Sequence, residues 1–522
     1  MPDEAMAQYD CLIIGSGVAG LSAALQAARW GKVAVLCKAD AATTNTNLAQ
    51  GGLAAVLSPD DSPARHVADT LAAGSWHNNK AVVKLLAQEA PHCIAELLRL
   101  GVPFDRDEQG ELALGLEGGH SHNRIVHARD QTGFYIQQKL LEAVSQTSNI
   151  TLLEHHMAVE LLLDSAAGYS RCAGARVLDS KNNRLTSIWS CATILASGGA
   201  GQLYRHTTNP AVATGDGIAL AYHAGAALED LEFVQFHPTT LYDPGNPAFL
   251  ISEAVRGFGA ELVLPGGKPF MQLYHRQGSL APRDVVSQAM HAEMQHLEVP
   301  CLFLDLRHLS YSKFANKFPT IAQKLQERGI DVRSELVPVV PAAHYMCGGV
   351  KTDLNGLSTL PGLYACGECD CTGLHGANRL ASNSLPEGWV MGRRAADHAE
   401  VWKHDIPTIL SASAEEEPAM QQVSTSTAAL LLKQQLQELM WQYVGIVRSR
   451  EGLLTCQEQV GTLCGQAAYF TTYSTEVLEL KILLTLSTLL IEACLQRKES
   501  IGGHYIKDDL LAVSPVSIVM AN

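Results

Sequence analysis

The alternation of apolar and polar stretches at the amino end of the chain predicts a β-α-β unit. Residues 9–14 are largely apolar, as in a strand buried on both faces, and a glycine-rich turn at 15–20 follows at once. Residues 21–28 are rich in Ala and Leu, which is typical of a helix, and residues 32–37 form a second apolar strand. Strands joined through a helix in this way belong to a parallel sheet.

The same pattern recurs later in the chain. A strand at residues 193–196 ends in a glycine-rich turn, and another at residues 363–366 ends in a Gly-Glu pair that precedes a helix. A loop rich in Gly, Ala, Asn and Thr covers residues 41–55, and a helical pattern runs from about 62 to 100. These segments extend the first unit into a larger α/β domain.

The texture of the chain predicts its domains. Residues 231–341 contain more proline and irregular segments, which indicates a domain inserted between two halves of a nucleotide-binding fold at 1–230 and 342–400. A polar stretch at 401–426 is typical of a linker, and 427–522 has a mostly helical pattern. We therefore expect a discontinuous α/β domain, an inserted domain and a C-terminal helical domain.

Composition limits the classes of function. The chain has 522 residues, of which 47% are hydrophobic and 17% charged, and this excludes a disordered protein. Its net charge of −15 argues against nucleic acid or an anionic membrane as a partner, and the longest late apolar run, residues 482–491, is too short to cross a bilayer. An acidic N-terminus unlike a signal peptide, together with 13 cysteines, predicts reduced thiols and a cytoplasmic protein.

Three cysteines, Cys366, Cys369 and Cys371, are spaced C-x2-C-x-C. This spacing alone suggests a metal, but no matching Cys or His pair stands at a distance typical of zinc. We therefore predict structural thiols and no metal.

The first turn matches the dinucleotide-binding pattern G-x-G-x-x-G, in the required context between a strand and a helix. The first glycine permits the tight turn, the second lets a pyrophosphate approach the backbone, and the third lets the helix pack against the strand. The helix N-terminus adds free N–H groups and a positive dipole. We therefore predict cofactor contacts at Gly15, Ser16, Gly17, Val18, Ala19 and Gly20.

The end of the second strand departs from the usual pattern, in which an acid binds the ribose. The nearby residues are Lys38 and Asp40. The sequence leaves open whether Lys38 contacts the nucleotide through its backbone, whether it serves a phosphate, or whether Asp40 binds the ribose.

This fingerprint serves both FAD and NAD. The long loop at 41–55 and the late strand-Gly-Glu-helix segment favour FAD, because a flavin buries its ring and needs contacts from distant parts of the chain. A second G-x-G-x-x-G is absent, so we expect a bound flavin that does not react with NAD(P)H.

Six segments, in order, resemble the flavoprotein family of succinate dehydrogenases, fumarate reductases and L-aspartate oxidases, with the L-aspartate oxidases the nearest branch. They are NLAQGG at 47–52, EGGHS at 117–121, QFHPT at 235–239, APRD at 281–284, PAAHYMCGG at 341–349 and GLHGANRLASNS at 373–384. The likeness covers about residues 9–400 and continues more weakly to the end. It implies an α/β Rossmann-type FAD-binding domain with an inserted α+β capping domain and a C-terminal helical bundle.

The resemblance also implies FAD contacts beyond the first turn. They are Lys38, Asn45, Thr46, Asn47, Leu48, Ala49, Gln50, Gly51, Gly52, Met157, Ala158, Asp216, Glu368, Ser384 and Leu385. Respiratory members bond FAD covalently through a His at the position of Asn45, so we expect non-covalent FAD here. Ser384 and Leu385 begin a helix whose positive end favours the anionic reduced flavin.

Two arginines are candidates for holding a dicarboxylate, because the planar guanidinium fork matches a carboxylate. Arg283 lies in the inserted domain and Arg379 in the flavin domain, so they are expected to face each other across a crevice, supported by His237 and His344. By resemblance, Arg379 and the two histidines bind a substrate carboxylate, and Arg283 matches a residue with a proton donor or acceptor role. We expect Arg283 to clamp the substrate, because a free arginine hardly deprotonates.

Three further residues match positions of the family that contact substrate. Gln235 and Ser252 match positions that help to hold the carboxylate, although simple structural hydrogen bonding explains them as well. Glu117 matches the position in L-aspartate oxidases that meets the substrate ammonium. Aspartate differs from succinate by this positive group, so a carboxylate beside it favours aspartate.

By resemblance, the chain is an FAD-dependent enzyme that oxidises L-aspartate to iminoaspartate by hydride transfer to flavin N5, the first step of NAD biosynthesis. Oxygen or fumarate would reoxidise the flavin, and quinolinate synthase is an implied partner for the labile product. The alternatives are a soluble fumarate reductase or succinate dehydrogenase flavoprotein, which Glu117 and Asn45 argue against, and a non-catalytic flavin-binding scaffold, which the retained arginines and histidines argue against.

Overall fold

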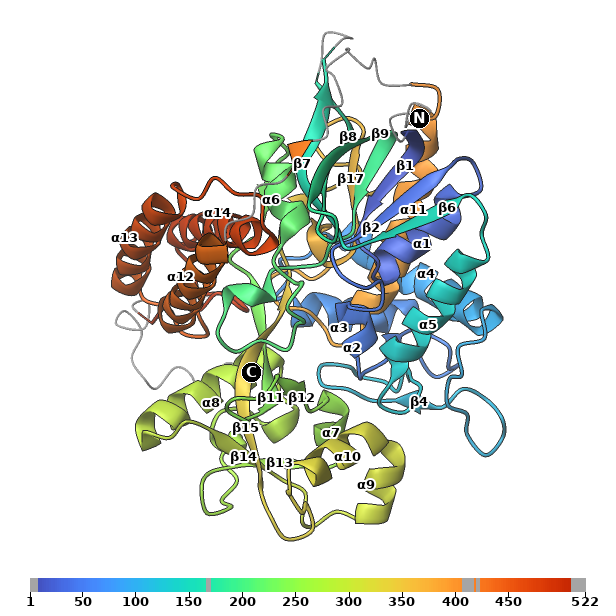
Figure 1. The fold of residues 1–522 in the computed structure, drawn as a ribbon. Helices are drawn as coiled ribbons and strands as arrows, with labels where there is room; N and C mark the ends of the chain where they lie inside the picture. The colour runs from blue at the N-terminus through green and yellow to red at the C-terminus, as the bar shows by residue number, and fades with distance from the viewer. Residues whose placement is uncertain (1–7, 166–169, 406–416, 419–422, 508–522) are drawn as a thin grey trace.

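A computed structural model describes residues 8–165, 170–405, 417–418 and 423–507. Figure 1 shows three parts: a large sheet with its helices at the top, a smaller sheet-and-helix body at the bottom, and a group of C-terminal helices at the left. Two long strands connect the top and bottom parts.

The upper part is built on a mixed sheet made of β1 (Gln8–Ile14), β2 (Val33–Cys37), β6 (Ile150–Glu154), β7 (His156–Asp164), β8 (Arg171–Asp179), β9 (Arg184–Leu195), β17 (Leu363–Ala365) and β19 (Glu417–Pro418). Its strand order is β6-β2-β1-β9-β8-β7, and β17 and β19 also pair with β9. Strands β6, β2, β1, β9 and β17 are parallel, whereas β7, β8 and β19 pair antiparallel.

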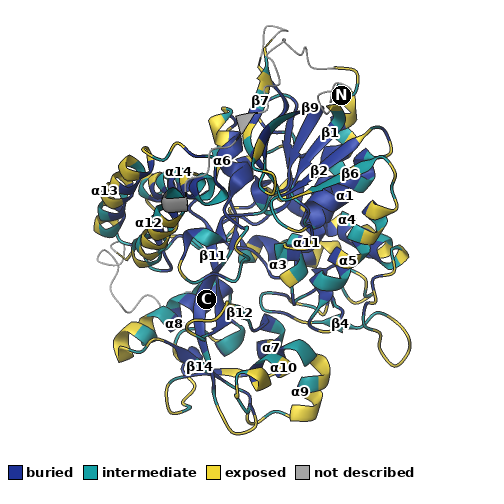
Figure 2. Cartoon of the chain, in the orientation of Figure 1, coloured by how far each residue is buried: buried dark blue, intermediate teal, exposed yellow. Residues whose placement is uncertain are grey.

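The predicted β-α-β unit is confirmed. β2 is buried along its whole length, and β1 is buried from Cys11 to Ile14, because helices cover the sheet. Figure 2 shows these strands in dark blue at the centre of the upper part. The helix of the unit, α1 (Val18–Ala27), packs along α11 (Ser384–Ala399) and against α5 (Thr132–Ser145), so the start of the chain lies beside a helix from its second half.

The helical pattern predicted between 62 and 100 is divided into α3 (Pro63–Ala73) and α4 (Lys80–Arg99). The break occurs because Asn79 begins the second helix, and its Oδ1 accepts a hydrogen bond of 3.1 Å from the Ala81 N–H. Beside these helices lie short elements of the long loop and its partners: α2 (Asn45–Leu48), β3 (Leu53–Ala54), β4 (Leu114–Gly115) and β5 (Ile125–Val126).

The lower part is an antiparallel sheet of β11 (Val234–Leu241), β12 (Phe249–Leu250), β13 (Glu261–Val263), β14 (Leu302–Asp305) and β15 (Val337–Met346), in the order β12-β11-β15-β14-β13. Its helices are α7 (Glu253–Gly257), α8 (Arg283–Leu297), α9 (Tyr311–Lys317), α10 (Pro319–Glu327), η2 (Met271–Leu273) and η3 (Gly278–Leu280). β15 runs past residue 341, where we predicted the domain boundary, and reaches the upper part as one continuous strand. The boundaries themselves stay predictions.

Smaller elements fill the junction between the parts: η1 (Gly201–Leu203), α6 (Asp216–His223), β10 (Leu228–Glu229), β16 (Gly349–Lys351), η4 (Gly367–Cys369), β18 (Asp370–Cys371) and η5 (Glu400–Trp402). Strands β10, β16 and β18 pair in that order. They place the turn after β17 next to the end of β15.

The C-terminal helices are α12 (Val423–Tyr443), α13 (Arg450–Ala467) and α14 (Thr475–Gln496). They begin before residue 427, where we expected the helical domain to start. Of the predicted linker at 401–426, residues 406–416 and 419–422 lie outside the described residues, as does the C-terminal segment 508–522. None of the helices within the described ranges is long and apolar enough to traverse a lipid bilayer.

Candidate functional site

A cavity of about 280 Å³ lies where the carboxyl ends of β1 and β2 meet the turn after β17 and the start of α11. Ligands of open parallel sheets bind at this edge. Residues predicted to contact FAD that line the cavity are Gly15, Ser16, Gly17, Val18, Ala19, Lys38, Asn45, Thr46, Leu48, Ala49, Gln50, Met157, Ala158, Asp216, Glu368, Ser384 and Leu385. Four others from that prediction lie outside the lining: Gly20, Asn47, Gly51 and Gly52.

The three glycines of the first turn have different surroundings. Gly15 has a φ of +119°, and a Cβ there would lie 2.1 Å from the Ala196 carbonyl oxygen. A Cβ at Gly20 would lie 2.0 Å from the Gly15 carbonyl oxygen, so both positions require close backbone packing. Gly17 lines the cavity, and a Cβ there would meet only the Thr46 side chain, at 3.2 Å. The turn thus leaves backbone open to the cavity, as a bound pyrophosphate needs.

The loop between β2 and β3 closes one side of the cavity. Thr46 Oγ1 accepts a hydrogen bond of 2.9 Å from the Val18 N–H at the start of α1. Asn45 Nδ2 donates to Glu368 Oε2 over 3.1 Å, which joins the loop to the turn after β17. Asn45, on which the expectation of non-covalent FAD rests, therefore has a carboxylate partner within the protein.

Lys38 is bound to acids of the protein. Its Nζ lies 2.9 Å from Asp216 Oδ2 and 2.9 Å from Glu479 Oε1 of α14. Asp216 and Lys38 both line the cavity, so this ion pair faces the predicted FAD site. Asp40 also lines the cavity, and it pairs with His155 over 2.9 Å. The alternatives for the ribose and phosphate contacts therefore stay predictions.

Glu368 is a half-buried acid in the wall of the cavity. Its Oε1 accepts a hydrogen bond of 3.1 Å from the Met346 N–H. Burial raises the pKa of Glu368 to about 7, against the hydrogen bonds that favour its anion. A carboxyl that is ionised only in part near neutral pH can both donate and accept hydrogen bonds.

The two candidate arginines, which we expected to face each other across a crevice, lie close together and meet at one side chain. Arg283 Nη1 donates to Gln235 Oε1 over 2.9 Å, and Arg379 Nε donates to the same oxygen over 3.2 Å. All three side chains are buried. Arg379 also bonds to the hydroxyl of Ser384 at the start of α11. Burial, and then the charge of Arg283, lower the pKa of Arg379 to about 10.

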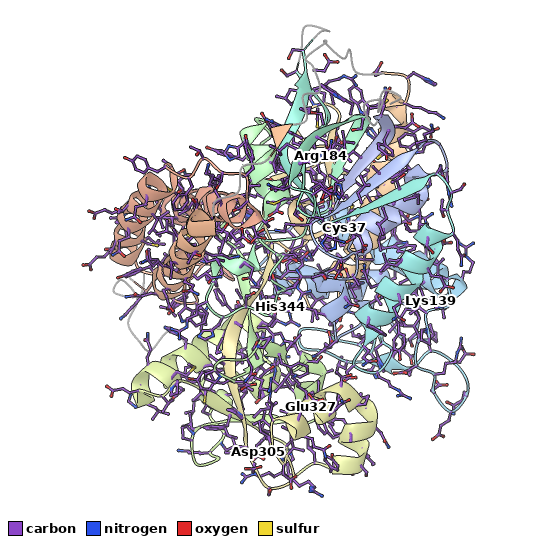
Figure 3. The ribbon with its side chains drawn as sticks, viewed as in Figure 1. Cys37, Lys139, Arg184, Asp305, Glu327 and His344 are labelled. Carbon is purple, nitrogen blue, oxygen red and sulfur yellow. The ribbon has the colours of Figure 1, made fainter. Side chains whose placement is uncertain are left out.

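The two predicted histidines also come together, with ring centroids 5.0 Å apart. Both are carried by the long strands, His237 on β11 and His344 on β15, and Figure 3 labels His344 between the upper and lower parts. Burial, reinforced by the positive charges of Arg283 and Arg379, holds the pKa of both imidazoles well below its usual range. His237 Nε2 is buried and has no hydrogen-bond partner among the residues that the structure describes, so it is available to a ligand.

Glu117 is buried beside the arginines. Its Oε2 accepts a hydrogen bond of 2.6 Å from Ser382 Oγ, and its Oε1 would lie 3.1 Å from a Cβ at Gly51. Burial, and then the charge of Glu253, raise the pKa of Glu117, whereas Arg283 and Arg379 lower it. Glu117 thus lies near two positive charges and a second buried acid, Glu253.

Ser252 lies at the edge of this group, where it begins α7. Its Oγ accepts a hydrogen bond of 3.3 Å from the Ala254 N–H, and its own N–H donates to Gln50 Oε1 over 3.1 Å. Gln50 Nε2 in turn donates to the Leu250 carbonyl over 2.7 Å. Ser252 therefore joins the loop between β2 and β3 to the lower part.

The sequence analysis missed the acid that pairs with Arg283. Glu253 Oε2 lies 2.6 Å from Arg283 Nε, and Arg256 Nη2 lies 3.5 Å from Glu253 Oε1. Burial opposes ionisation of Glu253, but the two arginines lower its pKa overall. The signal that the sequence offered was that Glu253 directly follows Ser252, a predicted substrate contact.

Tyr345 was also missed. The Arg379 guanidinium carbon lies 4.6 Å from the centre of its ring, a cation–π arrangement. Tyr345 follows the predicted His344 directly, so it projects from the opposite face of β15. Tyr345 thus helps to hold Arg379 in place, together with Gln235.

The cysteines offer no alternative chemistry that the structure supports. All 13 lie in the described residues and are free. In that part of the chain, no three His, Cys, Asp or Glu side chains gather as a metal site would require. The prediction that the protein needs no metal stays a prediction.

Comparison with known protein families gives two matches. Residues 10–385 match the family model described as FAD binding domain, and residues 433–510 match the model described as fumarate reductase flavoprotein C-term. Together they cover the upper and lower parts and the C-terminal helices. The predicted FAD cofactor is thereby confirmed.

Named relatives match along almost the whole chain. L-aspartate oxidase 1 of Ralstonia nicotianae is 43% identical, covering 96% of this chain and 95% of its own length. The L-aspartate oxidase of Pseudomonas aeruginosa is 42% identical, covering 97% of this chain and 96% of its own length. Among solved structures, a mutant of the E. coli quinol fumarate reductase FrdA has a TM-score of 0.88 at 31% identity, covering 97% of this chain and 92% of its own.

Proposed function

Because the chain belongs to the FAD-binding flavoprotein family that contains the L-aspartate oxidases, we propose that it oxidises L-aspartate to iminoaspartate, with FAD as the hydride acceptor. This is the first step of NAD biosynthesis. Oxygen or fumarate takes the electrons from the reduced flavin. The enzyme combines a Rossmann-type FAD-binding domain, an α+β capping domain and a C-terminal helical bundle.

The observation that carries the proposal is a buried carboxylate next to a pair of arginines. Aspartate at neutral pH has two carboxylates and one ammonium group. Arg283 and Arg379 supply the charges that the carboxylates need, and Glu117 supplies the charge that the ammonium needs. Succinate and fumarate lack the ammonium and gain nothing from Glu117.

The histidines complete the carboxylate site as uncharged donors. Their lowered pKa keeps both imidazoles neutral at physiological pH, so they add N–H donors without further positive charge. The buried Nε2 of His237, unpartnered among the described residues, is available to donate to a substrate carboxylate. We assign a substrate carboxylate to Arg379, His237 and His344, with Gln235 and Ser252 at its edge.

Arg283 has a separate place, because its Nε is held by Glu253 and its Nη1 by Gln235. A guanidinium fixed at two points cannot turn to follow a ligand, so it presents one constant charge to the substrate. This fits a clamp that holds the Cα–H bond in line with the cofactor. Bound FAD supplies the hydride acceptor at N5.

The residues of the cavity fit FAD. The Gly17 backbone is open to it, and α11 begins at its edge, where the N-terminal end of a helix favours negative charge on the flavin. Asn45 cannot form the covalent bond that a histidine forms in respiratory relatives, so we propose that FAD is held non-covalently. Acid precipitation should therefore release the flavin into the supernatant.

The product sets the further partners. Iminoaspartate hydrolyses readily, so we propose transfer to quinolinate synthase. The 13 free cysteines fit a reducing compartment, and we propose the cytoplasm.

One experiment tests the activity. The purified flavoprotein is mixed without oxygen with L-aspartate, D-aspartate, L-glutamate or succinate in turn, and the flavin absorbance is followed. We expect L-aspartate to bleach the flavin fastest. A protein that bleaches with succinate and not with L-aspartate would instead be a soluble fumarate reductase or succinate dehydrogenase flavoprotein, a candidate that the likeness to fumarate reductase structures favours.

A further inference from the structure

Ser382 lies between Glu117 and the segment at residues 52–54, and its backbone conformation is unusual. Its φ is +62°, in the left-handed region that residues with a Cβ rarely adopt. The Ala54 N–H donates to the Ser382 carbonyl over 2.9 Å, which helps to offset the cost of this conformation. Strained residues of this kind gather at functional sites.

The hydroxyl of Ser382 has a fixed direction. The Gly52 N–H lies 3.3 Å from Ser382 Oγ and donates to it, so a lone pair of the oxygen is occupied by the backbone. The hydroxyl proton is then left for Glu117 Oε2, 2.6 Å away. Ser382 is buried, so water does not compete for this bond.

A second contact ties the same two turns together. His120, three residues after Glu117, lies with Nε2 2.9 Å from the Ala381 carbonyl oxygen. Burial lowers the pKa of His120 to about 4, so the ring is neutral and donates its N–H there. The turn that carries Glu117 is therefore fixed to residues 381 and 382 through the His120 side chain and the Glu117 carboxylate.

We infer that Ser382 is a positioning residue that sets the preference for an amino dicarboxylate by fixing the Glu117 carboxylate. The inference rests on the proposed function, because it needs an ammonium group on the substrate. Without the hydroxyl, Glu117 loses its only described hydrogen bond and is free to turn toward Arg283 or Arg379, which would satisfy it equally well. It would then no longer meet the substrate ammonium.

The test compares Ser382→Ala, which removes the hydroxyl and keeps the Cβ, with Ser382→Gly, which also suits the left-handed backbone. We expect kcat/KM for L-aspartate to fall about 10- to 100-fold in both variants, the range for one charge-assisted hydrogen bond. Fumarate reduction should change less than about 3-fold. Ser190→Ala is the matched control, since it removes a buried hydroxyl whose partner is Thr193, within β9, and should leave both activities unchanged.

A double-mutant cycle shows whether the effect passes through Glu117. In a Glu117→Gln background, Ser382→Ala should cause less than about 3-fold further loss of aspartate oxidation. The pH profile gives a second readout: Ser382→Ala removes a bond that lowers the pKa of Glu117, so the acid limb for aspartate should move to higher pH, while that for fumarate should not. The groups facing Glu117 otherwise, Glu253, Arg283 and Arg379, are unchanged in this variant.

Each outcome is decisive. An equal loss for aspartate and fumarate, or an undiminished loss in the Glu117→Gln background, would overturn the inference. If Ser382→Ala does not fold, Ser382→Gly decides, with flavin content as the measure of folding. A wild-type protein that fails to oxidise L-aspartate would instead overturn the proposed function, which separates the two failures.

Discussion

Arg283 and Arg379 meet at a single acceptor atom, the Oε1 of Gln235, at 2.9 Å and 3.2 Å. Two like charges are thereby held together in a buried site, and a neutral amide sets their spacing. A bound dicarboxylate relieves this repulsion, since its carboxylates lie against the two guanidinium groups.

Gln235→Glu should weaken substrate binding. A carboxylate at this position would neutralise part of the arginine charge, and we expect KM for L-aspartate to rise about 10- to 100-fold, with flavin content unchanged. Steady-state kinetics with L-aspartate and with fumarate measure this, and both should be affected. Unchanged KM values for both would contradict the view that Gln235 sets the charge of the site.

Arg283→Leu should reduce both aspartate oxidation and fumarate reduction by about 1,000-fold or more, because the clamp and its charge are lost together. The yellow colour should persist, since Arg283 does not line the flavin cavity. Glu253 is left as a buried acid without its 2.6 Å partner, so thermal stability should be checked alongside. Normal turnover in a folded variant would remove Arg283 from the reaction.

Glu117→Gln should reduce aspartate oxidation about 10- to 100-fold more than fumarate reduction, because only aspartate carries an ammonium group to pair with the acid. Rates for the two reactions on one preparation measure the ratio. An equal loss on both substrates would show that Glu117 supports the site and does not select the substrate.

Glu368 makes stability depend on pH. The pKa of Glu368 is raised to about 7 in the folded protein. The neutral carboxyl, which favours folding, is fully populated below the pKa of the unfolded state. Its stabilising effect is lost as the pH rises through about 7. We expect Glu368→Gln to stabilise the flavin-free protein at about pH 8 by up to about 3 kcal/mol, and to have little effect near pH 4. Denaturant unfolding at the two pH values tests this, and a variant that gains equally at both would contradict it.

Glu479→Gln should loosen FAD. It removes one of the two acids that hold Lys38, and Lys38 lines the flavin cavity. We expect about 10-fold faster loss of flavin on dilution, followed by fluorescence of the released cofactor. Glu438→Gln is the control, because Glu438 pairs with Arg205 at the surface, where such a pair contributes little. Equal flavin loss from both variants would exclude a role of Glu479.

The fold was predictable where local pattern determines it. The β-α-β unit and its glycine turn follow from residues 9–37, because a buried parallel strand, a tight turn and a helix each leave a signal in the sequence. The break between α3 and α4 was not predicted, because both helices share one apolar face and only a short polar turn separates them.

The site was predictable where motifs carried it. The structure brings together Arg283, Arg379, His237 and His344, which the motifs had singled out. The contacts that hold the site residues were not predictable, because Glu253 pairs with Arg283 and Ser382 bonds to Glu117 across long stretches of chain, and no spacing in the sequence encodes such a contact. The same applies to Lys38, whose partner Glu479 lies in the C-terminal helices.

The strands β11 and β15 pass between the large sheet and the smaller one, and each carries one histidine of the carboxylate site. Arg379 stays with the upper body, whereas Arg283 belongs to the lower one. A rotation of the lower body about these two strands would separate Arg283 from Arg379 and would open the substrate site at the same time. Substrate entry, substrate binding and product release would then depend on the same rotation.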